Sequence, residues 1–340
     1  MCACSVDIGT GNLCSAKQDA NGEIKLKYIR DVFLDLANEP QTKSMLRLSK
    51  TDFIEDGDKI YVIGGPANTL ANIFQKSVRR PMSSGILSPG EKQAERVMMV
   101  LLEAILGKSQ SPTPEICFYS VPANPIDANL DIVYHKAMFS KLISQLNYVP
   151  IAMNEGAAVS YANAAPENFS SLSISFGAGQ VNICLMYQTV SGMEFSLARS
   201  GDFIDNSAAT STGSTPSRIQ ATKEKGIDLL DPSVGDPKTI REREAITIYY
   251  KSLILYTLEN IKKEFNKRQG SIDLPCAIPI ILSGGTSLPV HFRELFEEGF
   301  NTMKDSMPFT VSQIRMATDP LGAVAQGLLV AALNHADSNK

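Results

Sequence analysis

The stretch Val6-Asp7-Ile8-Gly9-Thr10-Gly11-Asn12 decides the fold of this chain. An apolar strand that runs into Asp and then Gly-Thr-Gly predicts a tight hairpin, because glycine lets backbone N–H groups come close to a bound anion. The hydroxyl of Thr10 adds a further donor. Such a hairpin is suited to holding phosphate oxygens, and it needs no catalytic His or Cys.

Three further segments have the same character. Ser173-Ile174-Ser175-Phe176-Gly177-Ala178-Gly179-Gln180 predicts a second strand and glycine turn, and a third apolar strand leads into Ser283-Gly284-Gly285-Thr286. Between the first two hairpins, Asn154-Glu155-Gly156 opens a helix of small residues. Because strand, glycine turn and strand occur twice, the sequence predicts a duplicated α/β architecture.

The composition narrows the class of protein. With 340 residues the chain is long enough for about two domains. It is 44% hydrophobic and 20% charged, with no apolar run of 18 residues and no basic-then-apolar signal at its start, which predicts a globular protein in the cytoplasm. A net charge of -4 without a basic stripe argues against a nucleic-acid partner. Six scattered cysteines predict reduced, mostly buried thiols, with Cys2 and Cys4 alternating on a strand rather than binding a metal.

Periodicity and turn residues predict the elements. We expect strands at 2–8, 13–18, 24–28, 59–64, 115–121 and 149–153, and helices at 90–106, 137–146 and 240–267. Residues 206–217, rich in Ser, Thr and Ala, are expected to form a flexible connection, and 231–237 a Pro/Gly loop.

The order and spacing of these segments resemble the ATPase superfamily of actins, heat-shock chaperones and sugar kinases, and within it the prokaryotic actins of the MreB and MamK kind. Residues 79–87 (RRPMSSGIL) resemble the "RPM" segment of MreB, and residues 319–327 (DPLGAVAQG) resemble its C-terminal "DPL" segment. Lys223-Glu224 stand where actins carry a nucleoside-contacting pair. The resemblance therefore covers nearly the whole chain.

The resemblance implies an actin-like ATPase fold: two similar α/β domains, each with a mixed sheet flanked by helices, with the nucleotide in the cleft between them. Domain I would be residues 1–152 plus the C-terminal helix 320–340, with a small outer subdomain at about 30–75. Domain II would be 153–319, with a small outer subdomain at about 203–245.

The resemblance also implies the site. ATP or ADP would bind with Mg²⁺, which Asp7 would hold through water, and Glu155 would orient the attacking water. Taken alone, Glu155 is better explained as a residue that favours a helix N-terminus, and Lys223-Glu224 as a solvated helix face. The expected nucleotide-binding residues are Gly9, Thr10, Gly11, Asn12, Ser175, Gly177, Ala178, Gly179, Gln180, Gly201, Asp202, Lys223, Glu224, Gly284, Gly285 and Thr286.

One residue departs from the family pattern. Actins and MreB-like proteins usually carry Asp at the start of the second phosphate turn, where this chain has Ser175. Loss of that charge removes an interaction worth on the order of a few kcal/mol in a partly dry site. The hypothesis is a weak, slow ATPase that retains its nucleotide.

Two classes of function follow from the resemblance. The first is a cytoskeletal protein that polymerises head to tail into filaments, with filament-binding or membrane adaptor proteins as further partners. The second is a protein that does not polymerise, either a nucleotide-dependent adaptor or a small-molecule kinase or phosphatase. The chain begins almost directly with its first strand and shows no amphipathic membrane helix there, so direct membrane binding is not expected.

Overall fold

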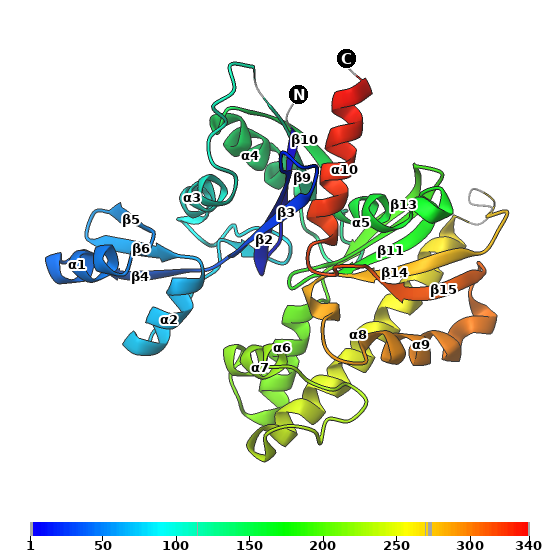
Figure 1. Ribbon diagram of the computed structural model, residues 1–340. Helices are drawn as coiled ribbons and strands as arrows, with labels where there is room; N and C mark the ends of the chain where they lie inside the picture. Colours follow the sequence, from blue (N-terminus) through cyan, green and yellow to red (C-terminus); the bar gives the residue numbers. More distant parts are fainter. Residues whose placement is uncertain (1–2, 114, 269, 271–273, 339–340) are drawn as a thin grey trace. The chain divides into compact units, whose positions relative to one another are not determined.

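A computed structural model describes residues 3–113, 115–268, 270 and 274–338 (Figure 1). The chain divides into two compact units. Unit 1 comprises Met1–Val121, Asp131–Met153 and Leu328–Lys340, and unit 2 comprises Pro122–Leu130 and Asn154–Gly327. Cys2, which the sequence places in the first strand, lies outside the described residues.

Unit 1 is built on a five-stranded mixed sheet in the order β10-β9-β1-β2-β3. The central strand β1 pairs antiparallel with β2 and parallel with β9. This sheet consists of β1 (Ala3–Ile8), β2 (Asn12–Gln18), β3 (Ile24–Arg30), β9 (Glu115–Val121) and β10 (Tyr148–Asn154).

Two helices, α3 (Ala94–Leu106) and α4 (Ile132–Gln145), cover this sheet. Buried apolar residues recur along α3 at helical spacing, from Val97 and Met98 to Leu101 and Leu102. One stripe of the helix therefore enters the core, as expected for an amphipathic helix on a sheet.

A small subdomain of unit 1 has its own sheet, in the order β4-β6-β5. Two helices pack on it around a separate apolar core that includes Leu34, Leu46 and Val62. Its elements are β4 (Phe33–Ala37), α1 (Pro40–Leu48), β5 (Phe53–Asp56), β6 (Lys59–Ile63) and α2 (Gly65–Phe74). The short hairpin of β7 (Met82–Ser83) and β8 (Ile86–Leu87) follows.

Unit 2 repeats the plan of unit 1. Its sheet has the order β13-β12-β11-β14-β15, in which β11 pairs antiparallel with β12 and parallel with β14. The strands are β11 (Ser171–Phe176), β12 (Val181–Tyr187), β13 (Val190–Leu197), β14 (Ile278–Ser283) and β15 (Val311–Met316). Two mixed sheets, each flanked by helices, confirm the predicted fold class.

The alternation of β11 explains how helices cover both faces of this sheet. Leu172, Ile174 and Phe176 enter the apolar core formed with α8 and α9, and Ser171 and Ser173 point to α5, which is rich in small residues. The helices of unit 2 are α5 (Glu155–Asn163), α6 (Gly201–Thr212), α7 (Pro216–Glu224), α8 (Ile240–Lys267) and α9 (Phe292–Met303). The last helix, α10 (Ala323–Ser338), crosses from unit 2 into unit 1.

The prediction of a flexible connection at 206–217 was wrong, because helices α6 and α7 occupy most of it. Buried Ile204 and Ala208 anchor α6 in the core of unit 2. Its hydroxyls bond within the helix: Thr210 Oγ1 donates to Asn206 O (2.9 Å), and Thr212 Oγ1 donates to Ala208 O (2.7 Å). Tertiary burial thus overrides the weak helix propensity of Ser and Thr.

Four of the described cysteines, Cys4, Cys14, Cys117 and Cys184, are buried free thiols, as predicted, whereas Cys276 is exposed.

Candidate functional site

The two glycine hairpins have the same local geometry. In unit 1 the N–H of Gly9 donates to Asn12 O (3.1 Å), and in unit 2 the N–H of Gly177 donates to Gln180 O (2.9 Å). A Cβ added at either glycine would lie 2.8 Å from the accepting carbonyl oxygen. Only glycine therefore fits the first position of each hairpin without a backbone shift.

In unit 1, Asp7 lies directly before its hairpin and is held by a residue of the neighbouring strand. Ser120 Oγ donates to Asp7 Oδ1 (2.8 Å) and accepts from the N–H of Ile8 (2.7 Å). Burial raises the pKa of Asp7 to about 6, and the hydrogen bond from Ser120 opposes that shift. A partly buried carboxylate with a raised pKa gains from a nearby cation, which favours its charged form.

The other residues of this hairpin bond to segments further along the chain. Thr10 Oγ1 accepts from the N–H of Gly85 (3.1 Å), and Gly11 O accepts from the N–H of Asp31 (3.1 Å). Asn12 begins β2 and pairs with Arg30 on β3. Asp7, Gly9, Thr10, Gly11 and Asn12 thus lie together in unit 1.

In unit 2, the carbonyl of Gly177 is a meeting point of three predicted segments. It accepts from the N–H of Gly201 (3.1 Å) and from Thr286 Oγ1 (2.9 Å). The next carbonyl, of Ala178, accepts from the N–H of Asp202 (2.8 Å). The second hairpin, the start of α6 and the Gly-Gly-Thr loop therefore come together in one place.

Close backbone approach fixes glycine at two of these positions. A Cβ on Gly201 would lie 2.4 Å from Thr286 Oγ1. At Gly284, φ is +93° and a Cβ would lie 2.3 Å from Phe176 O. Gly285 is less crowded, since its Cβ would lie 3.4 Å from Leu321 Cδ1. The Gly-Gly loop needs its first glycine for both conformation and space.

Glu155, the expected water-orienting residue, is the first residue of α5. Asn182 Nδ2 donates to Glu155 Oε2 (3.0 Å), and Asn182 Oδ1 accepts from the N–H of Ala123 (2.9 Å). The backbone donor fixes the orientation of the Asn182 amide, which then presents its NH₂ to the carboxylate. Gly156 brings α5 close to β12, where a Cβ would lie 2.7 Å from Cys184 Cβ.

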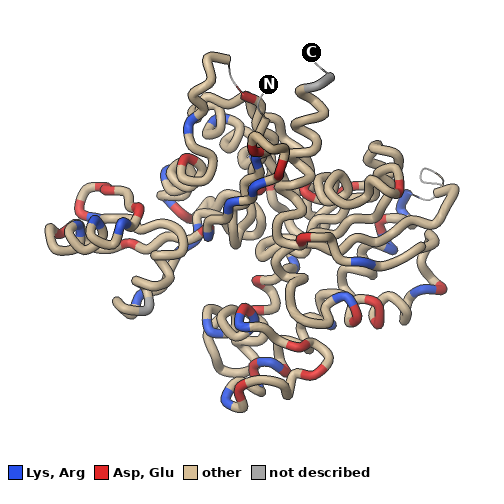
Figure 2. Tube along the Cα trace, viewed as in Figure 1, with Lys and Arg blue, Asp and Glu red and all other residues tan. Residues whose placement is uncertain are grey.

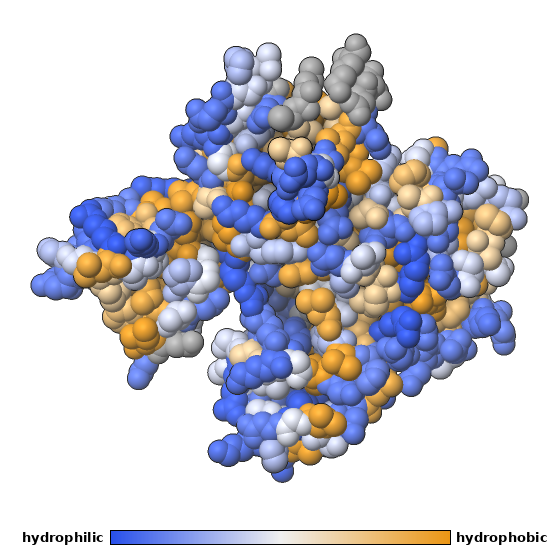
Figure 3. All heavy atoms as spheres, in the orientation of Figure 1, coloured by the Kyte–Doolittle hydropathy of each residue, from blue (hydrophilic) through white to orange (hydrophobic). Residues whose placement is uncertain are grey.

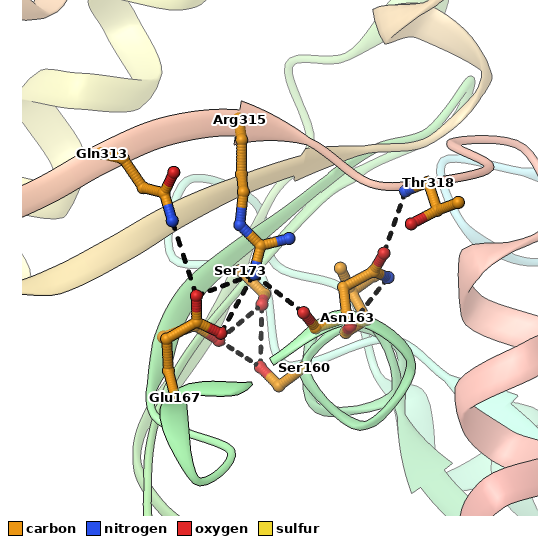
Figure 4. A network of polar contacts seen from close by, with 9 residues as sticks. Ser160, Asn163, Glu167, Ser173, Gln313, Arg315 and Thr318 are labelled. Atoms are coloured by element: carbon orange, nitrogen blue, oxygen red, sulfur yellow. Dashed lines mark hydrogen bonds and ion pairs between the residues drawn. The ribbon is translucent and has the colours of Figure 1, made fainter. Parts of the chain in front are cut away.

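A polar network anchors the rest of α5 (Figure 4). Near its C-terminal end, Arg315 of β15 donates to Asn163 O (2.8 Å) and forms an ion pair with Glu167 (3.1 Å). In its middle, Ser160 Oγ lies 2.8 Å from Ser173 Oγ of β11. The helix that carries Glu155 is therefore tied to two strands of the sheet.

Lys223 and Glu224 differ in their surroundings. Lys223 is largely buried and its Nζ lies 2.6 Å from Asp205 Oδ1 of α6. Glu224 is exposed and accepts from Gln220 Nε2 (3.0 Å). Tyr250 links this region to the Gly-Gly-Thr loop, because its hydroxyl donates to Thr286 O (3.0 Å). Lys223 is thus no simple solvated residue, whereas Glu224 lies on the exposed side of α7.

Ser175 is buried on β11, opposite Asn182 of β12 and beside Ser283 of β14. Gly179 and Gln180 complete the hairpin, and Gln180 is buried too. The described strand neighbours of Ser175 thus carry hydroxyl and amide side chains but no carboxylate.

Sequence reasoning missed three residues of the site: Ser120, Asn182 and Asp205. Each is a buried polar residue on a strand or helix, and Ser120 and Asn182 have apolar neighbours on both sides. That pattern is a signal in the sequence, since buried polar groups are retained where they have partners. Their partners are far away along the chain, however, and Ser120 is 113 residues from Asp7.

The donor set also limits how a metal ion could bind. Within the described part of the chain, no group of three or more His, Cys, Asp or Glu side chains could hold one. Mg²⁺ commonly keeps several waters and binds through one or two carboxylates plus substrate phosphates. The partly buried carboxylate of Asp7 fits that kind of site.

Comparisons with known proteins identify a family and similar folds. A model of the protein family described as Volactin matches residues 2–332. The structure is similar to that of a MamK double helical filament (16% identity, TM-score 0.71, 98% of each chain covered). It is also similar to MreB5 of Spiroplasma citri bound to AMPPNP (12% identity, TM-score 0.66, 99% of this chain and 98% of that chain).

The ethanolamine utilization protein EutJ from Carboxydothermus hydrogenoformans is a third similar structure (13% identity, TM-score 0.55, 97% of this chain and 90% of that chain). These likenesses show the two-domain actin-like fold. No curated protein matches the sequence. Among the helices of the described residues, none combines the length and apolarity that crossing a membrane requires.

Proposed function

Because the chain belongs to the Volactin family and has an actin-like fold, we propose that it binds ATP or ADP with Mg²⁺ and polymerises into cytoskeletal filaments in the cytoplasm. The observation that carries the proposal is the matched pair of glycine hairpins, each at the end of the central strand of its sheet. The similar MreB5 has been solved with AMPPNP and with ADP, and the similar MamK as a double helical filament.

In this proposal the two hairpins hold phosphate oxygens. Backbone N–H groups of residues 10–12 and 178–180 donate, since those of Gly9 and Gly177 already close the hairpins, and Thr10 adds its hydroxyl. Asp7, whose pKa is raised by burial, would hold Mg²⁺ through water, and the ion would supply positive charge beside the phosphates. Glu155 orients the attacking water, with Asn182 fixing its carboxylate.

The nucleoside side is assigned to the segments that meet near Gly177. Gly201 and Asp202 start α6, and the Gly284-Gly285-Thr286 loop offers backbone without obstructing side chains. Lys223 and Glu224 of α7 are proposed to contact the adenine and ribose sides. The domain boundaries 1–152 with 320–340, and 153–319, remain the prediction made from the sequence.

We further propose that hydrolysis is slow, because Ser175 brings no charge to the metal and water. Retained nucleotide and slow hydrolysis would give long-lived filaments. Ser175 also favours an alternative function, that of an adaptor that binds nucleotide without polymerising.

Titration of the purified protein with a fluorescent ATP analogue and Mg²⁺ tests the nucleotide site. Gly177→Ala places a Cβ 2.8 Å from Gln180 O and should weaken binding by at least tenfold. Gly90→Ala is the matched control, since no heavy atom lies within 4 Å of its added Cβ. Absence of saturable binding by the wild-type protein would refute the proposal.

A further inference from the structure

Helix α1 presents an exposed surface of apolar and basic residues. Leu48 is 86% exposed, and the helix bears a shallow depression. The depression is lined by Pro40, Gln41, Ser44, Met45, Leu48 and Ser49. Figure 3 shows hydrophobic side chains at the surface of the small subdomain that contains α1 and α2. We name the exposed residues of 40–50 the α1 face.

The charged residues of the α1 face itself are basic, and Glu55 of β5 pairs with Lys43 (2.7 Å). From residue 40 to 51 the sequence contains Lys43, Arg47 and Lys50 and no Asp or Glu, and Figure 2 shows this basic character along α1. Arg47 is 70% exposed and its nearest described carboxylate partner, Glu55, is 3.9 Å away. Its guanidinium can therefore reach a second carboxylate on another molecule.

A second exposed surface, in unit 2, is apolar and acidic. Two loops form it, joined because the N–H of Leu229 donates to Val290 O (3.1 Å) and the N–H of Val290 donates to Ile227 O (3.1 Å). From residue 226 to 237 the sequence has three Asp and no Lys or Arg; Asp228 pairs with His291 (2.7 Å), so Asp231 and Asp236 carry the acidic character. We name this surface the acidic loop face; its exposed members are Leu230, Asp231, Val234, Asp236, Leu288 and Val290.

This loop is held in shape by Arg243, whose side chain is buried. Its guanidinium donates to Pro232 O (2.8 Å), Asp236 O (2.6 Å) and Ser233 O (3.2 Å). Exposed apolar residues on a loop fixed in this way lose little conformational entropy on binding. The acidic loop face is thus preorganised for a partner.

We propose that the α1 face of one copy binds the acidic loop face of a second copy. The inference rests on the proposed function, since a polymer needs a contact between two different surfaces of the same chain. Apolar residues meet apolar residues at the centre, and Arg47 and Lys50 meet Asp231 and Asp236 at the rim. A heterologous contact of this kind extends into an open filament unless its rotation closes a ring.

Charge reversal tests the contact directly. Arg47→Glu and Asp231→Arg each place like charges opposite one another, and each should raise the critical concentration for pelleting with Mg²⁺-ATP at least tenfold. The double variant restores opposite charges and should return to within about threefold of wild type. Matched controls are the reversals Lys136→Glu on α4 and Glu194→Lys on β13, which are exposed outside both faces and should leave pelleting unchanged.

Leu48→Asn tests the apolar centre, because Leu48 makes no contribution to the core and its variant should fold normally. Sedimentation velocity without nucleotide provides a readout independent of filaments. If the wild type forms filaments and all three single variants form them equally well, this inference is overturned and the proposed function stands. Reversible dimers that are lost in Arg47→Glu and regained in the double variant, in a protein that never forms filaments, would support the contact and refute polymerisation. A wild-type protein that is monomeric under every condition would overturn both.

Discussion

At the scale of single residues, Glu155 is proposed to orient the attacking water, and Asn182 to hold its carboxylate. Glu155→Gln keeps the shape but removes the carboxylate, so ATP hydrolysis should fall at least tenfold while nucleotide affinity stays within about threefold. Asn182→Ala removes the donor to Glu155 Oε2 and should give the same separation of rate from affinity. Phosphate release and nucleotide titration on the same samples measure both quantities. Equal losses of affinity and rate would mean that these residues act by binding.

Ser175 is the second residue with a direct prediction. Ser175→Asp restores the charge that related proteins usually carry, so it should accelerate phosphate release by about tenfold or more. Because Ser175 is buried, the new carboxylate needs Mg²⁺ nearby, and the gain should disappear in EDTA. Ser175→Thr, which keeps a hydroxyl, is the matched control. A rate unchanged by Asp would remove Ser175 from the explanation of slow hydrolysis.

Asp7 links stability to pH. Its pKa is raised by burial from an ordinary 3.8 to about 6, so folding favours the protonated form. This contribution to stability is fully present below about pH 4 and is lost as pH rises through about 6. At pH 7.5, Asp7→Asn should therefore stabilise the nucleotide-free protein by about 1 to 3 kcal/mol.

The same variant should lose the stabilisation that Mg²⁺-ATP gives to the wild type. Thermal unfolding from pH 4 to 8, in EDTA and in Mg²⁺-ATP, measures both effects. Asp52→Asn, at an exposed carboxylate, is the control. If the stability of the wild type and of Asp7→Asn depended on pH in the same way, burial would not raise the pKa of Asp7.

The sequence predicts the residues of the hairpins well, because their function depends on local backbone geometry. Gly9 and Gly177 each donate a backbone hydrogen bond to the carbonyl three residues later, which leaves no room for a Cβ. Asn182 could not be predicted in its role, because its partners Glu155 and Ala123 are brought to it by the sheet and not by the local sequence. Residues that act through long-range contacts, such as Asn182, can therefore be identified only once the fold is known.

At the scale of elements, α5 and α10 approach one another closely at Gly327. A Cβ on Gly327 would lie 1.7 Å from Ala158 O, so the helices touch through backbone. Gly327→Ala should force them apart and lower the free energy of unfolding by at least about 2 kcal/mol. Gly65→Ala in α2 is the matched control, with nothing near its added Cβ, and should be neutral or stabilising by up to about 1 kcal/mol.

Denaturant unfolding of the two glycine variants measures this difference. If Gly327→Ala were as stable as wild type, α5 and α10 would have to pack differently from the arrangement described. Because α5 also carries Glu155, the variant should slow hydrolysis as well.

Helices were predicted correctly where apolar residues recur at helical spacing, and were missed where tertiary contacts stabilise the helix. The helix α8 (Ile240–Lys267) has the bounds expected from its apolar spacing. Residues 206–217 gave no such pattern, since their Ser, Thr, Asn and Gly favour loops and turns, and burial of Ile204 and Ala208 stabilises the helix. Composition alone could not reveal that burial.

At the scale of the whole molecule, the duplicated strand order was predictable from the two strand–glycine–strand segments. The five-stranded sheets share one plan, with β1 and β11 each flanked by an antiparallel hairpin partner and a parallel strand. Surfaces for self-association were not predictable, because the α1 face and the acidic loop face depend on which apolar residues the fold leaves exposed.

Sedimentation of the purified protein with Mg²⁺-ATP, against a nucleotide-free control and with the pellets examined by electron microscopy, tests the central claim most directly. We expect filaments in the pellet with Mg²⁺-ATP, and none when Gly177→Ala replaces the wild type. A protein that binds ATP but stays in the supernatant across a wide range of concentrations would contradict the claim and favour the non-polymerising adaptor.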